Sequence, residues 1–293
     1  HVVMRKYSER AKEQPKRVVF PEGDEERILR AARILVDRGI ARPVLLGPEQ
    51  VILDKVKELN LDLDPTAIEI VNPHTFERVE AYCEEFSRIR ARRGVTMREA
   101  RYRMHSRKWM GMMMVHMGDA DVAVTGLTTH YPVSIRPVLE VIGTRKGAGL
   151  IAGMYMVLLK QDVKFFADCT VKANPTAEEV AEIAIVTAEK VREMGVEPRI
   201  AMISFSNFGS SRQESSIKMA KATQLVKDRR PDLEVDGEMQ FDTAADFEMM
   251  KATYPFCELK GPANTFIFPN LDAGNMSYKM MATIGGAEVV GPI

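Results

Sequence analysis

The stretch RVVFPEGDEERILRAARILVDR at residues 17–38 decides the fold class, because it places a strand, a short turn and a helix in direct succession. Residues 17–20 are rich in β-branched and aromatic side chains and predict a strand. Residues 24–38 predict a helix with Asp24 as its N-cap. The expected apolar face of this helix consists of Ile28, Ala31, Ala32 and Leu35. A strand that passes through a turn into a helix is the repeating unit of parallel α/β sheets.

The same alternation continues through all 293 residues, a length that predicts about two domains. Further strands are expected at residues 43–46, 68–71, 122–124, 150–159, 165–166, 200–205, 233–236, 265–268 and 288–290. Further helices are expected at residues 50–59, 76–93, from Thr96 onward, 132–142, 176–194, 214–228 and 273–284. This pattern predicts an α/β fold of two three-layer αβα domains with mainly parallel sheets.

The stretch at residues 144–149 contains Gly and Lys and is the expected crossing between the domains. We expect residues 1–145 to form the first domain and residues 146–287 the second. The isolated last strand suggests that residues 288–293 return to the first domain. The abrupt start at His1, without an initiator Met, suggests a piece of a longer chain.

Composition excludes several classes of function. The 41 basic residues balance the 41 acidic ones, whereas proteins that bind nucleic-acid or membrane phosphates normally carry a basic excess. The longest notable charge-free apolar stretch, residues 147–159, is shorter than the roughly 20 residues of a membrane-spanning helix. The odd set of Cys83, Cys169 and Cys257 suggests neither a disulfide framework nor a zinc site, so a reducing cytoplasm is expected.

Polar loops follow five of the expected strands and share hydroxyl, amide and glycine residues. These loops lie at residues 21–23, 125–130, 206–211, 236–240 and 269–275. Any one of them would be typical of an ordinary turn into a helix. Together, at the edge where the carboxyl ends of parallel strands meet, they favour a ligand that carries phosphate.

Arginines support a phosphate ligand, because guanidinium groups bind phosphate in a bidentate manner. Arg136, expected at the start of a helix after the loop at 125–130, is the strongest candidate. Three of the four arginines that crowd one helix end, Arg88, Arg90, Arg92 and Arg93, fit a solvated helix terminus. The remaining motifs indicate no chemistry. His105, His116 and His130 match no metal spacing, the Met-rich run at 110–117 suits a core, and residues 143–149 lack the P-loop order.

At these loops the sequence resembles the phosphotransacetylase (phosphate acetyl- or butyryltransferase) family over residues 17–293. The matching segments lie at residues 18–23, 111–115, 204–206, 236–240, 269–275 and 291–293. Within that family the chain is most similar to the C-terminal domain of bacterial hybrid NADP-dependent malic enzymes. Dedicated phosphotransacetylases usually carry Ser-Thr-x-Gly-Ser where residues 206–210 read SNFGS, and Ala-x-His-Ser/Thr-Thr where residues 127–132 read LTTHYP. Residues 113–121, MMVHMGDAD, also fit the malic branch better.

The resemblance implies two α/β domains with a ligand cleft between them, the second domain mediating dimerisation. Family chemistry is attack of the CoA thiolate on acetyl phosphate, with an Asp as base and arginines on the phosphate. Arg90 and Arg136 match two of those arginines, whereas the family's Asp-Leu-Ser-Arg-Gly segment would follow Ile293. We therefore assign no catalytic residue and no metal ligand. The expected acetyl-CoA and phosphate site comprises Arg90, Thr128, Thr129, Arg136, Ser206, Asn207, Gly209, Ser210, Asn275 and Lys279.

The favoured hypothesis is an acetyl-CoA-binding regulatory and oligomerisation domain of a hybrid malic enzyme that decarboxylates malate to pyruvate. Acetyl-CoA would be its effector, the catalytic domain would lie in the same chain, and NADP and a divalent metal would belong to that domain alone. The alternative is an active phosphate acetyltransferase. A third class, an NADP-dependent dehydrogenase domain, is disfavoured because no GxGxxG opens any expected helix.

Overall fold

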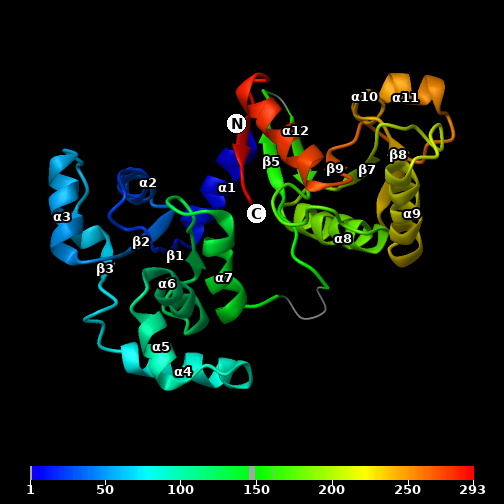
Figure 1. Ribbon diagram of the computed structural model, residues 1–293. Coiled ribbons are helices and arrows are strands. Elements are labelled where there is room, and N and C mark those ends of the chain that lie inside the picture. The colour runs from blue at the N-terminus through cyan, green and yellow to red at the C-terminus, as the bar shows by residue number, and fades with distance from the viewer. Residues whose placement is uncertain (1, 145–148, 161) are drawn as a thin grey trace. The chain divides into compact units, whose positions relative to one another are not determined.

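The computed structural model describes residues 2–144, 149–160 and 162–293, which divide into two compact units (Figure 1). One unit spans Val2–Thr144, and the other contains the described residues of 145–293. The expected crossing at 144–149 falls on residues 145–148, which lie outside the described residues. None of the helices in the described ranges is both long enough and apolar enough to span a bilayer.

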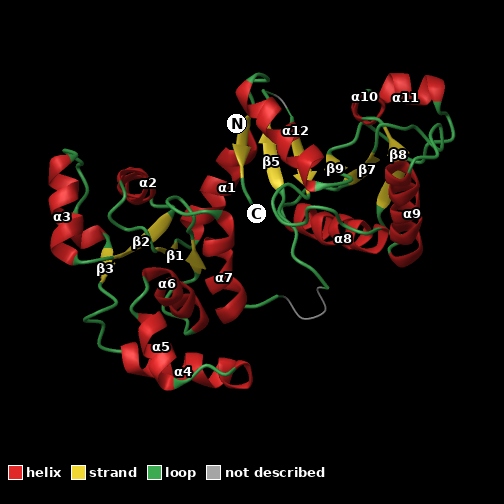
Figure 2. Ribbon diagram, viewed as in Figure 1, coloured by secondary structure: helices red, strands yellow, loops and turns green. Residues whose placement is uncertain are grey.

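The unit at Val2–Thr144 is built on an all-parallel sheet in the order β3-β2-β1-β4. Its elements are α1 (Val2–Glu13), β1 (Lys16–Phe20), α2 (Glu26–Asp37), β2 (Ala41–Leu46), α3 (Glu49–Glu58), η1 (Pro65–Ala67), β3 (Glu69–Val71), α4 (Val79–Arg90), η2 (Ala91–Arg93), α5 (Met97–Met104), α6 (Arg107–His116), β4 (Val122–Ala123) and α7 (Tyr131–Val141). Figure 2 shows helices on both sides of this sheet.

Two apolar clusters, one on each face, hold this sheet in a three-layer arrangement. Because side chains alternate along a strand, Val19 packs in the cluster with residues of α4, α5 and α6, whereas its neighbour Phe20 packs with those of α2 and α3. Leu46 and Leu45 of β2 divide between the two clusters in the same way. Most of the Met-rich run lies on α6 and fills the first cluster, as the sequence predicted.

The first predicted helix starts two residues later than expected. The N-cap of α2 is Glu25, which makes no side-chain capping bond, so the prediction of Asp24 as cap is wrong. The Asp24 carboxylate instead accepts a hydrogen bond from Arg107 at 2.6 Å. An ion pair to a residue far along the chain therefore replaces the local capping bond. The buried positions of α2 are Ile28, Leu29 and Ala32, with Ala31 and Leu35 only partly buried.

The second unit contains a six-stranded sheet in the order β10-β5-β6-β9-β7-β8. Its elements are β5 (Tyr155–Leu158), β6 (Val163–Ala167), α8 (Ala177–Glu193), β7 (Arg199–Ile203), α9 (Glu214–Arg229), β8 (Glu234–Met239), α10 (Phe241–Ala245), α11 (Phe247–Thr253), β9 (Thr265–Ile267), α12 (Leu271–Thr283) and β10 (Glu288–Val290). The β6, β9, β7 and β8 strands are parallel, while β5 and β10 run antiparallel to their neighbours. Helices α8 and α9 pack against the sheet, as do α10 and α12, which gives the expected parallel-dominated α/β fold.

The chain end at residues 288–293 differs from the expected return to the first domain. Strand β10 pairs with β5, Glu288 opposite Leu158 and Val290 opposite Met156, so it completes the sheet of the second unit. The backbone of Ile293 also exchanges hydrogen bonds with Met154. The outer side of β5 offers unpaired backbone groups that a nearby strand can satisfy, and a strand pattern alone does not tell which edge it joins.

Candidate functional site

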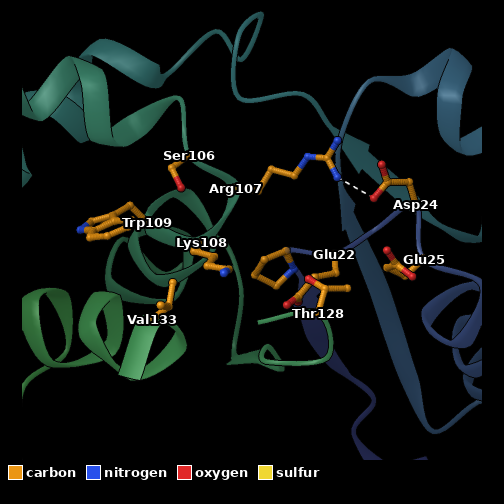
Figure 3. A pocket seen from close by; sticks show the side chains of 10 residues that line it. Glu22, Asp24, Glu25, Ser106, Arg107, Lys108, Trp109, Thr128 and Val133 are labelled. Atoms are coloured by element: carbon orange, nitrogen blue, oxygen red, sulfur yellow. Dashed lines mark hydrogen bonds and ion pairs between the residues drawn. The ribbon is translucent and has the colours of Figure 1, made fainter. Parts of the chain in front are cut away.

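A polar pocket of about 510 Å³ lies in the Val2–Thr144 unit at the carboxyl ends of β1 and β4 (Figure 3). The loop after β1, the first turn of α6, the loop after β4 and the start of α7 supply its walls. The lining residues are Pro21, Glu22, Asp24, Glu25, Ser106, Arg107, Lys108, Trp109, Thr128 and Val133. In an open parallel sheet this edge is where ligands bind, so we regard the pocket as the candidate site.

Glu22 joins the two strand ends beneath the pocket. Its side chain is only 6% exposed, and Oε1 accepts a hydrogen bond from the backbone N–H of Gly126 at 3.0 Å. The other oxygen, Oε2, has no hydrogen-bond partner among the described residues. The next residue must be glycine, because a Cβ at Gly23 would lie 2.7 Å from the backbone nitrogen of Leu46. The tight turn therefore holds a buried carboxylate at the pocket with one oxygen free.

Two cations enter the pocket from the first turn of α6. Arg107 is neutralised by Asp24, whereas the Lys108 amine donates to the neutral hydroxyl of Thr129 at 2.7 Å. Thr129 in turn shares a hydrogen bond of 2.8 Å with the hydroxyl of Ser134. Because the partner of Lys108 carries no charge, this bond leaves the positive charge of the amine available to an anion.

The first turn of α6 adds a further positive contribution. Its N-cap, Ser106, makes no side-chain capping bond, so the hydroxyl does not occupy the first N–H groups of the helix. A helix N-terminus carries roughly half a positive charge. The starts of α2 and α7 lie at the same pocket through Glu25 and Val133. The combination suits an anion of phosphate size.

Three of the four predicted residues of this unit lie at two neighbouring sites. Thr128 lines the candidate pocket, and Thr129 is bonded to Lys108. Arg136 lines a second pocket of about 720 Å³, which shares Ser106 and Trp109 with the first.

The expected position of Arg136 is wrong, because it lies in the middle of α7 rather than at its start. Its side chain is 62% exposed and its Nε donates to Glu140 at 2.8 Å. Arg90 ends α4 and lines neither of the two pockets described above. Its Nε is buried without a hydrogen-bond partner among the described residues.

In the second unit, the loop at 206–211 follows β7 and is bound to the end of β8. The buried carboxylate of Glu238 accepts from the Ser206 hydroxyl at 3.0 Å and from the Gly209 N–H at 2.7 Å. The Ser210 hydroxyl accepts from the Asn207 N–H at 3.0 Å. The loop therefore binds an anionic group of its own chain in this structure, and its role toward an external phosphate stays a prediction.

The last two predicted residues lie on α12. The Asn275 amide donates to the Cys169 carbonyl at 3.1 Å, and Lys279 is exposed. Next to Cys169, the carboxylate of Asp168 is 3% exposed and accepts four backbone N–H groups. These donors belong to Gly153, Thr170, Val171 and Lys172, at 2.7–3.1 Å. Four N–H groups converge on one carboxylate, which closes the loop after β6.

The chain offers no activated thiol among its buried cysteines. Burial raises the pKa of Cys257 to about 11 and that of Cys169 still higher, so neither forms a thiolate at neutral pH. Burial also raises the pKa of Cys83. In the described ranges no three His, Cys, Asp or Glu side chains gather as they would around a metal ion.

Sequence reasoning did not single out Glu22 and Lys108. Glu22 lies in one of the five polar loops, so its position was visible but its burial was not. Lys108 follows Ser106 at the start of a helix that the sequence analysis did not assign. A Ser before a Lys-containing apolar run is a helix-start signal that could have placed this amine at the sheet edge.

The chain matches the phosphate acetyl/butaryl transferase family over residues 2–293. It is 39% identical over 285 residues to a phosphate acetyltransferase of Nitratidesulfovibrio vulgaris, covering 97% of this chain and 40% of that protein. It is 38% identical to the NADP-dependent malic enzyme of Escherichia coli, covering 100% of this chain and 39% of that one. A phosphotransacetylase structure from Streptococcus pyogenes superposes with a TM-score of 0.90 at 33% identity, covering 100% of this chain and 88% of the other. The chain thus spans about two fifths of the two curated relatives.

Proposed function

Because the chain belongs to the phosphate acetyl/butaryl transferase family, we propose that it transfers an acetyl group between coenzyme A and phosphate. The supporting observation is the pocket at the ends of β1 and β4, where the Lys108 amine meets the N-terminus of α6. The likeness to a phosphotransacetylase over 88% of that chain favours this activity over the regulatory role that we expected first.

In this reaction the sulfur of coenzyme A attacks the carbonyl carbon of acetyl phosphate. A C–S bond forms, the C–O bond to phosphate breaks, and its electron pair leaves with the phosphate. The thiol proton passes to solvent or to a base. The positive field of Lys108 and of the α6 N-terminus would stabilise the negative charge that gathers on the departing phosphate.

A steady-state assay of acetyl-CoA formation from acetyl phosphate and coenzyme A tests the proposal. We expect Lys108→Met to lower kcat/KM by about ten- to a hundredfold, the effect of losing one hydrogen bond to a charged group. Lys55→Met is the matched control, because Lys55 pairs with Glu58 on the surface of α3. Absence of turnover in the parent protein, or equal rates in both variants, would contradict the proposal.

A second candidate function is acetyl-CoA binding in the regulation of a fused malic enzyme. It is favoured by the likeness to the Escherichia coli NADP-dependent malic enzyme across the whole of this chain. In that case acetyl-CoA is an effector, the catalytic domain lies in the same chain, and NADP and the divalent metal are bound there. Acetyl-CoA would then bind and raise the melting temperature without being turned over.

Arg136 and Arg30 provide a matched pair for measuring acetyl-CoA binding. Both are exposed helix residues, and each donates from Nε to a glutamate four positions away at 2.8 Å. Arg136 alone lines the pocket next to the candidate site, so Arg136→Ala should weaken binding about tenfold or more while Arg30→Ala leaves it unchanged. Equal affinities in calorimetry would remove Arg136 from the acetyl-CoA site.

We also propose that the protein forms homo-oligomers through the second unit. Helix α12 exposes Met276 and Met280, and its C-cap residue Ile284 is exposed after the same interval of four residues, which gives an apolar stripe along one face. Light scattering of Met280→Glu against the parent protein tests this, and an unchanged mass would contradict it.

A further inference from the structure

We propose that Trp109 sets the length of the acyl group that the candidate pocket accepts, because its indole closes the apolar end of that pocket. The acetyl group of acetyl phosphate fits in front of the indole, whereas the indole hinders longer acyl groups. The inference rests on the proposed function, since it concerns which acyl phosphates the protein uses as substrates.

The two ends of the candidate pocket differ in polarity. Figure 3 shows Trp109 and Val133 on one side of Lys108, and the carboxylates of Asp24 and Glu25 on the other. The phosphate of an acyl phosphate belongs at the Lys108 amine, whose positive charge is available to an anion. Contact of the acyl chain with the indole and the Val133 methyl groups removes apolar surface from water, whereas contact with the carboxylates would cost them hydration. The apolar end is therefore the one that receives the chain.

Trp109 is a fixed wall at that end. Its Nε1–H donates to Glu140 Oε2 at 3.4 Å, and the Arg103 guanidinium lies 5.6 Å from the centre of the indole ring. Arg103 and Glu140 also pair with each other, and their side chains are only 14% and 12% exposed. Turning the indole aside for a longer chain would break both its hydrogen bond to Glu140 and its cation–π contact with Arg103. The structure therefore holds the indole in place.

A second cavity lies next to this wall. The pocket of about 720 Å³ shares Trp109 and Ser106 with the candidate pocket, and its walls also carry the rings of His74, Tyr102 and His105. Residues that line both pockets stand between them. Because Ser106 is small, the indole of Trp109 supplies most of the partition. Removal of the indole should therefore join the two cavities and make room for added methylene groups.

Steady-state kinetics with acetyl, propionyl and butyryl phosphate, each with coenzyme A, test the inference through ratios of kcat/KM. In the parent protein we expect each added methylene group to lower kcat/KM by about tenfold or more, in line with the discrimination that apolar pockets reach. Trp109→Ala should raise the butyryl-to-acetyl ratio by about ten- to a hundredfold. A parent protein that uses butyryl phosphate as well as acetyl phosphate would overturn the inference, and so would a parent-like ratio in Trp109→Ala.

Two further variants keep the test decisive even where Trp109→Ala fails to fold. Tyr102→Ala is the matched control, because it removes an aromatic ring that lines the second pocket and not the candidate pocket, so its ratios should equal those of the parent. Val133→Phe enlarges the other apolar side chain at the same end, at a position that is 51% exposed and can hold a larger ring. It should lower the propionyl-to-acetyl ratio by about tenfold. A raised ratio in Tyr102→Ala, or an unchanged one in Val133→Phe, would contradict the inference.

Binding measured without turnover separates this inference from the proposed function. Acylphosphonates carry the acyl group directly on phosphorus, so they lack the C–O bond that the reaction breaks. In calorimetry, acetylphosphonate should bind the parent protein about tenfold or more tightly than butyrylphosphonate, and this difference should shrink in Trp109→Ala. Length-selective binding without turnover of acetyl phosphate would refute the proposed function alone. Turnover of acetyl phosphate without discrimination by chain length would refute this inference alone.

Discussion

Three buried carboxylates lie at strand ends in the two units, and they differ in how completely they are satisfied. In the second unit Asp168 accepts four backbone N–H groups, and Glu238 accepts a hydroxyl and an N–H from the loop after β7. In the first unit Glu22 uses one oxygen and leaves the other without a partner in the described structure. The first two carboxylates act as internal anions that close loops, whereas Glu22 is left incomplete at a pocket. The same group at similar places can thus stabilise the fold or prepare a site.

The largest effect should follow from Asp168→Ala, because several buried N–H groups lose their acceptor together. Each N–H group left without an acceptor costs about 1–3 kcal/mol, and local rearrangement of the loop recovers a part of this cost. We therefore expect the free energy of unfolding to fall by about 3–5 kcal/mol. Trp109, the one tryptophan of the sequence, lies in the first unit and reports on that unit alone. The urea concentration at the midpoint of unfolding should fall when it is measured by circular dichroism. The midpoint measured by Trp109 fluorescence should stay unchanged.

The control for Asp168 is Asp162→Ala, which removes a carboxylate that is 56% exposed and pairs with Lys164. Because solvent screens the charge of Asp162, the change should cost less than about 1 kcal/mol. Equal losses in the two variants would mean that the four N–H bonds to Asp168 contribute little.

A smaller loss is expected for Glu238→Gln. This change keeps the size of the side chain but weakens its bonds to the Ser206 hydroxyl and the Gly209 N–H, which are charge-assisted. The loss should be about 1.5–3 kcal/mol in the circular dichroism transition. The loop at 206–211 should also become more sensitive to proteolysis, which limited digestion measures. A stability equal to that of the parent would show that the two bonds to Glu238 do not stabilise the loop.

Glu22→Gln should change stability by less than about 1 kcal/mol, although Glu22 is as deeply placed as the other two carboxylates. The substitution preserves the Oε1 bond to Gly126 and removes a charge that has no partner on its second oxygen. The fluorescence transition of Trp109 checks this directly. A loss of stability as large as that of Glu238→Gln would mean that Glu22 stabilises its unit as much as Glu238 stabilises the other.

The smallest effect belongs to Glu85, a partly exposed carboxylate on α4. Hydrogen bonds from Arg88 and then His116 hold the pKa of Glu85 at about 2, below its usual value of about 4.3. The stabilisation is therefore present above pH ~4.3 and is lost as the pH falls toward ~2. Because Arg88 is mostly exposed, it should amount to less than about 1 kcal/mol. Glu85→Gln should flatten this part of the stability profile measured by Trp109 fluorescence, and an unchanged profile would contradict the assignment.

The alternation of strands and helices was largely predictable from the sequence. Apolar residues recur every second position in a half-buried strand and about every 3.6 positions in a helix with one buried face. The last strand was placed correctly along the chain and assigned to the wrong sheet, since its direction depends on the free edge of β5. Helices α10 and α11 were missed because five and seven residues are too few to show a helical period. Local sequence patterns indicate whether a segment forms a helix or a strand. Which sheet a strand joins depends on hydrogen bonds to residues elsewhere in the chain.

The site was predictable in its location and less so in its residues. Two of the identified loops, those after β1 and β4, line the pocket, and Thr128 lies in it. Arg136 was expected at a helix start because it follows the loop at 125–130, yet α7 begins five residues earlier. Glu22 could not be recognised, because the burial of a carboxylate depends on Gly126, more than a hundred residues away.

The pairing of β1 with β4 also has a consequence for folding kinetics. Val18 lies opposite Val122, so the strands meet only after a long stretch of chain has been ordered. In the second unit β5 and β6 pair locally, with Leu158 opposite Val163. Local hairpins form within about 1–10 μs, whereas non-local parallel pairings form far more slowly. The walls of the pocket come from both β1 and β4, so anion binding should appear only in the last kinetic phase of refolding, after most of the helical signal has returned.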